Sequence, residues 1–378
     1  MASSTIITTL AVVQQQLIRY GCSAWIIFGV PGCLLNVILL SRRQFRVTSC
    51  CNYFLGASAV LIITISLSSG AYLYSLNHPD PITTIRAFCK ARLYVLQTTM
   101  MMGRWMITSA CIDRYALSSR NARVRRFAQV HVARRVILIV IGIWLVLPIH
   151  TLIFYEIRET AGICAIVNSR AAALYHSIYL LTTGGVLPAI IMIASALLIR
   201  RNLASKRDIH EQQINVSIPT TQHNTNTHVQ RARDQNALAM LFIQVTVYCI
   251  VQTPQFVYTL YAAITSNIPN KSPDRLAIEK FAFFIAELCV FLFPVSSFYV
   301  YILVSRTFRT ELRNLIHPLF PMCFGRWNFR VVPISNITNT VTEHNEMNMA
   351  PHALSFRSQE ANHQLNKHPN IMYGEQIK

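Results

Sequence analysis

Residues 136–155 read VILIVIGIWLVLPIHTLIFY, a stretch without a single Asp, Glu, Lys or Arg. The hydrocarbon core of a bilayer is about 30 Å thick, and an α-helix rises about 1.5 Å per residue, so about 20 apolar residues span it. This stretch therefore predicts a helix that crosses a membrane.

The composition of the whole chain agrees with a membrane protein. The 378 residues are 53% hydrophobic and 13% charged, whereas soluble proteins are about 45–50% apolar and about 25% charged. A disordered chain would lack these apolar residues, and ten cysteines in this length are too few for a disulfide-rich secreted domain. The net charge of +19 would suit a nucleic-acid binder, but so hydrophobic a chain argues against nucleic acid as a partner.

Six further stretches are long and apolar enough to span a bilayer: 22–40, 51–76, 89–117, 172–199, 237–264 and 278–304. The stretch 89–117 is the weakest, because it contains Arg92, Gln97 and Arg104. We expect an all-α fold, a seven-transmembrane helix bundle over residues 22–304.

The remaining segments are polar or amphipathic. Residues 1–21 are expected to form a short N-terminal segment, residues 200–236 a polar loop, and residues 317–378 a mostly disordered tail. Residues 305–316 place Phe308, Leu312 and Leu315 at helical spacing among arginines. This pattern predicts an amphipathic eighth helix at the membrane surface.

The distribution of Lys and Arg predicts the orientation of the chain. Alternate loops carry basic clusters with few acids, and such loops face the cytoplasm: Arg42, Arg43 and Arg46; Arg120, Arg123, Arg125, Arg126, Arg134 and Arg135; Arg200, Arg201, Lys206, Arg207, Arg231 and Arg233. The N-terminus is then extracellular and the C-terminus cytoplasmic. The same basic residues would bind anionic lipid headgroups.

A constellation of motifs fits this topology. Asp113-Arg114-Tyr115 lies at the cytoplasmic end of the third span, Cys89 lies 25 residues before Arg114, and Cys164 follows the fourth span. Further positions lie in the expected spans, namely Asn36, Trp144, Pro188 and Pro254. Over about residues 20–320 the chain resembles the rhodopsin-like (class A) G-protein-coupled receptors, and more loosely those of invertebrate peptides.

This resemblance implies a plasma-membrane receptor that binds an extracellular, neuropeptide-like ligand and activates a heterotrimeric G protein. It implies no enzyme activity, no cofactor and no metal ion. It also implies a disulfide between Cys89 and Cys164, where the alternative is two free thiols. Asn36 would form hydrogen bonds with neighbouring helices.

The resemblance further implies a switch at the cytoplasmic end. Arg114 would pair with Asp113 and with Asp234, and breaking the pair with Asp234 would free the sixth helix to open a site for the G protein. Asp234 has the alternative of being an ordinary loop acid. Tyr301 matches the family's tyrosine at the end of the seventh span, and Cys323 matches a palmitoylation site or is a free cysteine.

Several positions depart from the family pattern. The slot of a sodium-binding Asp holds Ile62, and Ser297 replaces an Asn, so sodium regulation of the usual kind is not expected. The usual Trp of the sixth span is Gln252, and the inner Tyr of the fifth span is Ala196.

Polar side chains within the spans are the candidates for ligand binding, because each is costly there unless it is paired. Glu287 of the seventh span could receive a cationic group of a ligand, or it could form a structural pair with Arg92 or Lys280. Leu96 occupies the position that binds amines in aminergic receptors, which argues against a monoamine. Further candidates by position are Gln97, His176, Gln255, Tyr258 and Tyr261.

Arg104 lies in the middle of the third span, where an unpaired cation costs about 2.5–3.5 kcal/mol. We expect it to share hydrogen bonds with Gln252 and Tyr248 as a buried polar connector between the third and sixth helices. The chief alternative to a receptor is a seven-helix transporter or channel, but the sequence shows no repeat. A membrane enzyme is a further alternative, although His150 and His176 have no carboxylate at ligand spacing.

Overall fold

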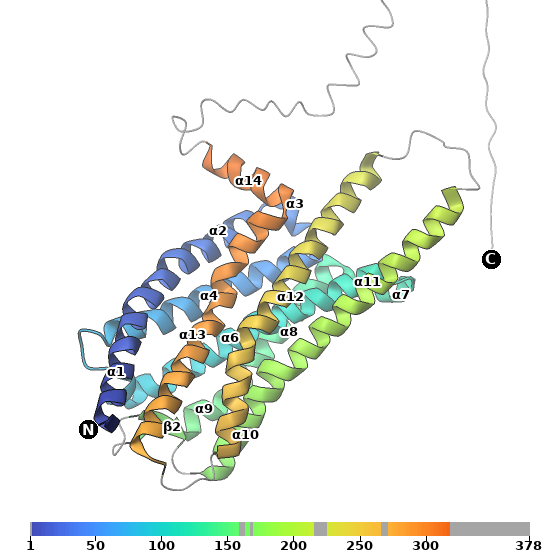
Figure 1. Ribbon diagram of the computed structural model, residues 1–378. Coiled ribbons are helices and arrows are strands. Elements are labelled where there is room, and N and C mark those ends of the chain that lie inside the picture. Colours follow the sequence, from blue (N-terminus) through green and yellow to red (C-terminus); the bar gives the residue numbers. More distant parts are fainter. Residues whose placement is uncertain (1, 159–162, 167–168, 215–224, 266–270, 318–378) are drawn as a thin grey trace, which may run out of the picture. The chain divides into compact units, whose positions relative to one another are not determined.

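The structure, a computed structural model, describes the chain except for residues 1, 159–162, 167–168, 215–224, 266–270 and 318–378. The side chains of residues 2–4, 158, 163, 206–214 and 225–237 also lie outside the description. The described part is a bundle of long helices with one two-stranded antiparallel sheet, shown in Figure 1. An all-α fold is therefore confirmed.

The helical elements follow the predicted spans closely. They are α1 (Ala2–Leu17), the π-helical turns η1 (Ile18–Cys22) and η2 (Trp25–Gly29), α2 (Val30–Leu40), α3 (Arg43–Arg46), α4 (Ser49–Tyr74), α5 (Pro81–Thr84), α6 (Arg86–Ser118), α7 (Ala122–Arg125), η3 (Arg126–Ala128), α8 (Val130–Val146), α9 (Ile149–Phe154), α10 (Arg170–Leu181), η4 (Thr182–Val186), α11 (Leu187–Ile214), α12 (Thr225–Thr265), α13 (Pro273–Val304) and α14 (Arg306–Ile316).

Six stretches of the described chain are long and apolar enough to cross a membrane: Thr5–Leu40, Ser49–Tyr74, Val130–Phe154, Arg170–Ser205, Leu238–Thr265 and Pro273–Val304. Helix α6 has 33 residues, which gives a length of about 50 Å, but its polar and charged residues keep it from joining them. It packs against α4, α8 and α11, and three of its charged side chains, Arg92, Asp113 and Arg114, are buried.

The helix ends differ most from the predicted ones in two regions. The first helix begins at Ala2 and not near residue 22, because residues 2–21 have enough apolar residues and no proline to interrupt the helix. Helices α11 and α12 extend into the predicted loop at residues 200–236. The described parts of that loop contain neither Pro nor Gly, so nothing ends these helices near the membrane.

The strands β1 (Tyr155–Arg158) and β2 (Ile163–Ile166) form an antiparallel hairpin after the fourth span. In its register Ile157 pairs with Cys164. This hairpin was not predicted from the sequence.

Contacts between helices include the one expected for Asn36. Its side-chain amide donates to the Ser297 hydroxyl on α13 at 3.2 Å, and Ser297 in turn donates to the Pro294 carbonyl at 2.9 Å. Asn36 is fully buried, so these hydrogen bonds join α2 to α13 inside the bundle.

Helix α14 is amphipathic, as predicted. Phe308 is fully buried against Tyr301 and Phe298, and Glu311 forms an ion pair with Arg42 at 2.7 Å. Ser305 caps the helix by accepting a hydrogen bond from the backbone of Phe308.

Candidate functional site

Helices α6, α10, α12 and α13, together with β1, line a cavity of about 290 Å³. Five of the six side chains that were predicted as ligand contacts are in its wall: Gln97, His176, Gln255, Tyr258 and Glu287. Arg104 and Gln252 also line it. The fold therefore brings together candidates from four helices that are far apart in sequence.

Glu287 is held by a tyrosine from the second span. The Tyr72 hydroxyl donates to Glu287 Oε2 at 2.5 Å, and the Arg92 guanidinium carbon lies 5.3 Å from the centre of the Tyr72 ring, a cation–π arrangement. Among the described residues, no ion pair joins Glu287 to Arg92 or Lys280. Tyr72 thus connects the acid to α4.

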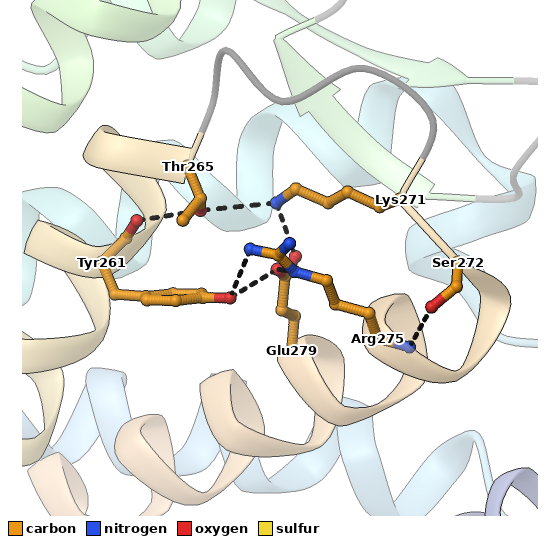
Figure 2. A network of polar contacts seen from close by, with 6 residues as sticks. All are labelled: Tyr261, Thr265, Lys271, Ser272, Arg275 and Glu279. Carbon is orange, nitrogen blue, oxygen red and sulfur yellow. Dashed lines mark hydrogen bonds and ion pairs between the residues drawn. The ribbon is translucent and has the colours of Figure 1, made fainter.

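Tyr261 does not line the cavity. Figure 2 shows it in a polar network between α12 and α13, where Glu279 accepts hydrogen bonds from the Tyr261 hydroxyl at 2.9 Å, from Arg275 at 3.1 Å and from Lys271 at 2.7 Å. Arg275 also donates to the Tyr261 hydroxyl at 3.0 Å. The expectation that Tyr261 is a pocket residue was wrong. Its hydroxyl forms hydrogen bonds with Glu279 and Arg275 outside the cavity.

Arg104 bonds to the backbone of the fifth span. Its Nη1 donates to the Gly184 carbonyl at 2.9 Å, and the Tyr248 hydroxyl donates to the same oxygen at 3.0 Å. Trp105 donates to the neighbouring Thr183 carbonyl at 3.0 Å. These carbonyls belong to the π-helical turn η4, where the wider turn disturbs the regular hydrogen bonding of the helix.

The connector therefore differs in detail from the predicted one. Arg104 and Tyr248 meet at the Gly184 carbonyl, so α6 and α12 are joined through η4. Gln252 is 1% exposed, and neither polar atom of its amide has a hydrogen-bond partner among the described residues.

Other amide atoms of the cavity wall are also without partners. Gln97 Nε2 and Gln255 Oε1 are buried and have no hydrogen bond within the described chain. Each such buried group costs about 1–3 kcal/mol. A polar ligand or water molecules in the cavity would recover this free energy.

His176 forms a pair with His150 at the side of the cavity. His150 Nε2 lies 2.9 Å from His176 Nδ1, and His150 Nδ1 lies 2.9 Å from the Leu147 carbonyl oxygen. The ring of Tyr155 packs edge-on against His176 with centroids 5.3 Å apart. Burial raises the pKa of Tyr155 above its ordinary value, so its hydroxyl stays neutral.

The predicted disulfide between Cys89 and Cys164 is present, with Cα atoms 5.9 Å apart. It ties the start of α6 to strand β2. Glu156 of β1 forms ion pairs with Arg86 and with Lys90, the latter at 3.8 Å. The hairpin is thereby fixed beside the cavity that Tyr155 lines.

At the other end of α6, Arg114 is buried beside Asp113. Arg114 Nη2 donates to Asp113 Oδ2 at 2.8 Å and to the Ser49 hydroxyl at 3.0 Å, while Ser49 donates to the same carboxylate oxygen at 2.7 Å. Ser49, at the first position of α4, is a member of this cluster that the sequence analysis missed. The predicted partner Asp234 has a side chain outside the described residues.

Three further predicted residues are Tyr301, Tyr115 and Cys323. Tyr301 is 1% exposed and packs against Phe54 and Phe308, with ring centroids 5.2 and 5.8 Å apart. Tyr115 continues α6 directly after Arg114. Cys323 lies outside the described residues, so its lipidation stays a prediction.

Comparison with known proteins identifies relatives of the chain. The sequence model of the 7 transmembrane receptor (rhodopsin family) matches residues 32–299. The neuromedin-U receptor 2 of Mus musculus is 22% identical over 306 residues, which are 79% of this chain and 74% of that receptor.

Proposed function

Because the chain belongs to the rhodopsin family of seven-transmembrane receptors, we propose that it binds an extracellular peptide and activates a heterotrimeric G protein. Members of this family are receptors, so the transporter, channel and enzyme alternatives are dropped. The helix α6, which hydropathy alone indicates only weakly, is then the third of seven spans. The protein is a multi-pass membrane protein.

The cavity carries the proposal of a peptide ligand. Its wall combines one carboxylate, from Glu287, with amides and aromatic rings, and this mixture suits the donors, acceptors and apolar side chains of a peptide. Glu287 would receive a cationic group, with Tyr72 holding the carboxylate in place. Similarity to a receptor named for neuromedin U favours the same class of ligand.

The cluster at Arg114 supports coupling to a G protein. A buried guanidinium held by Asp113 and Ser49 is a two-state element, because a few kcal/mol of differential binding can release it. We infer that ligand binding frees Arg114 and that the cytoplasmic end of α12 moves outward. Asp234 on α12 would pair with Arg114 in the resting state, and the outward movement would break this ion pair. Tyr301 would support the open form.

The basic loops support the proposed orientation. We infer that the protein lies in the plasma membrane with its N-terminus outside and its C-terminus in the cytoplasm. Anionic lipids would contact the basic cytoplasmic loops and α14, and Cys323 would add a lipid anchor. Nucleic acid has no part in this function.

The proposal can be tested by screening a peptide library on cells that express the chain, with guanine-nucleotide exchange as the readout. A peptide that activates the wild-type chain should lose at least about tenfold in potency with Glu287→Gln, since a tenfold loss corresponds to about 1.4 kcal/mol. Arg114→Ala should abolish exchange and leave peptide binding in place. Exchange that is unaffected by Arg114→Ala would overturn the proposed coupling.

A further inference from the structure

We propose that His176 presents an unprotonated Nε2 atom to the cavity and that His150 imposes this tautomer. The site would then accept a hydrogen bond from an N–H or O–H group of the ligand. The ligand part of this inference rests on the proposed receptor function, whereas the tautomer does not depend on it.

The first step concerns His150. Its Nδ1 lies 2.9 Å from the Leu147 carbonyl oxygen, and a carbonyl oxygen can only accept a hydrogen bond. His150 Nδ1 must therefore carry the hydrogen. A neutral imidazole has one N–H, so His150 Nε2 is an acceptor.

The acceptor on His150 in turn fixes the position of the hydrogen on His176. His176 Nδ1 lies 2.9 Å from His150 Nε2, and because that nitrogen is an acceptor, His176 Nδ1 must donate. In the neutral ring the remaining nitrogen, Nε2, then has a free lone pair. No donor within the described chain forms a hydrogen bond with His176 Nε2, and the residue lines the cavity.

Aromatic packing holds both rings in these orientations. Tyr175 and Tyr179 lie edge-on to His150, with ring centroids 5.2 and 5.0 Å away. Tyr155 and Tyr179 flank His176, at 5.3 and 6.2 Å. These contacts hold the planes of the rings, and a flip of either imidazole would break the hydrogen bonds at its nitrogens, so packing and hydrogen bonding together fix the tautomer.

The pair also responds to acid in a defined way. One added proton can be placed on His176 Nε2 while the bond to His150 stays intact, and it converts the acceptor into a donor. A second proton would set two N–H groups against each other across 2.9 Å. The bond between the two rings is therefore compatible with one added proton but not with two.

The surrounding groups bear on this proton. From the neighbouring elements the cavity wall contributes Arg92 and Arg104 of α6, Tyr258 of α12, Glu287 of α13 and Tyr155 of β1. The two arginines oppose an added positive charge, and Glu287 favours it. Tyr175 and Tyr179 of α10 itself also pack against the pair.

The tautomer can be measured directly on the purified full-length chain, without a ligand. We would label histidine with ¹⁵N, place the chain in lipid nanodiscs at neutral pH, and assign His176 from the spectrum of His176→Gln. The expected result is a protonated Nδ1 and an unprotonated Nε2 on His176. A protonated Nε2 at neutral pH would overturn the proposal, and it would leave the receptor function untouched.

The variant His150→Phe tests the cause, because it keeps an aromatic ring and removes the acceptor for His176. We expect His176 to lose its fixed tautomer in this variant and to keep it in the control His131→Phe, where an exposed histidine of α8 is removed. An unchanged His176 tautomer in His150→Phe would refute the role of His150. Should that variant fail to fold, the wild-type spectrum alone decides the proposal.

A second arm tests the ligand chemistry with active peptides from the library. Backbone N-methylation, which removes one N–H donor at a time, should identify a position where potency falls at least tenfold in the wild-type chain and little in His176→Phe. Failure to find such a position would overturn the ligand contact, because it would show that the Nε2 acceptor faces water.

Discussion

Arg104 and Tyr248 donate hydrogen bonds to one acceptor, the carbonyl oxygen of Gly184, from 2.9 and 3.0 Å. The third and sixth spans are therefore joined through the backbone of the fifth. A guanidinium in the middle of a span is tolerated because this oxygen and the polar cavity replace part of its hydration.

The glycines of η4 should be essential for close packing of these helices. A Cβ atom on Gly185 would lie 2.1 Å from the Phe256 ring, so Gly185→Ala should destabilise the protein by about 1–3 kcal/mol through overpacking. Thermal unfolding of the purified chain measures this. Gly142→Ala is the control, because nothing lies within 4 Å of its added Cβ, and equal stability of the two variants would contradict the prediction.

Ser49 should help to hold the resting state. Ser49→Ala removes one hydrogen bond each from Arg114 and Asp113, and a loss of about 1 kcal/mol would raise the population of the released state about fivefold. Ligand-free nucleotide exchange should rise accordingly. Ser69→Ala is a matched control on the same helix, since the Ser69 hydroxyl is buried without a hydrogen-bond partner among the described residues. Similar basal exchange in both variants would argue against this role.

Tyr72 should stabilise the bundle through Glu287. Tyr72→Phe removes a hydrogen bond to a partly buried carboxylate, and a hydrogen bond to a charged group is worth about 1.5–3 kcal/mol. The same change at Tyr299, whose hydroxyl bonds to the Phe28 carbonyl at an exposed position, should cost less. Denaturant unfolding in detergent compares the two, and a larger loss for Tyr299→Phe would count against the Tyr72–Glu287 contact.

The disulfide should contribute strongly to stability. Cys89 and Cys164 are 75 residues apart, and closing a loop of this size is worth about 4 kcal/mol in the chain-entropy description. Cys164→Ser should therefore lower the melting temperature and the amount of protein that reaches the membrane. Cys249→Ser, at a free cysteine, should have little effect, and comparable losses would indicate that the disulfide adds no stability.

The sequence predicted the fold well because membrane spans follow a simple physical rule. Apolar length located every span, but it indicated α6 only weakly, and Asp113-Arg114-Tyr115 with its distance from Cys89 strengthened that prediction. Hydropathy is weak there because α6 carries polar and charged residues, of which Arg92 and Arg114 are buried against other helices. Predicted helix ends were poor where polar residues continue a helix, as in α11 and α12.

The site was predicted by position but not by contact. Glu287 and His176 were placed in the cavity wall correctly. Their partners, Tyr72 for Glu287 and His150 for His176, were not recognised. The Gly184 carbonyl was not recognised as the acceptor for Arg104. A backbone acceptor leaves no side-chain signal in a sequence. The pair Gly184-Gly185 within an apolar span was the one available clue that other side chains approach the backbone there.

The π-helical turn at Thr182–Val186 affects how this chain is aligned with its relatives. Such a turn contains one residue more than an α-helical turn, and one residue corresponds to a rotation of about 100° around the helix axis. When a relative has a regular fifth helix, positions before the turn, including His176, match only if a gap is introduced at η4. An alignment without that gap would assign the role of His176 in the cavity to a neighbouring residue on a different face of the helix.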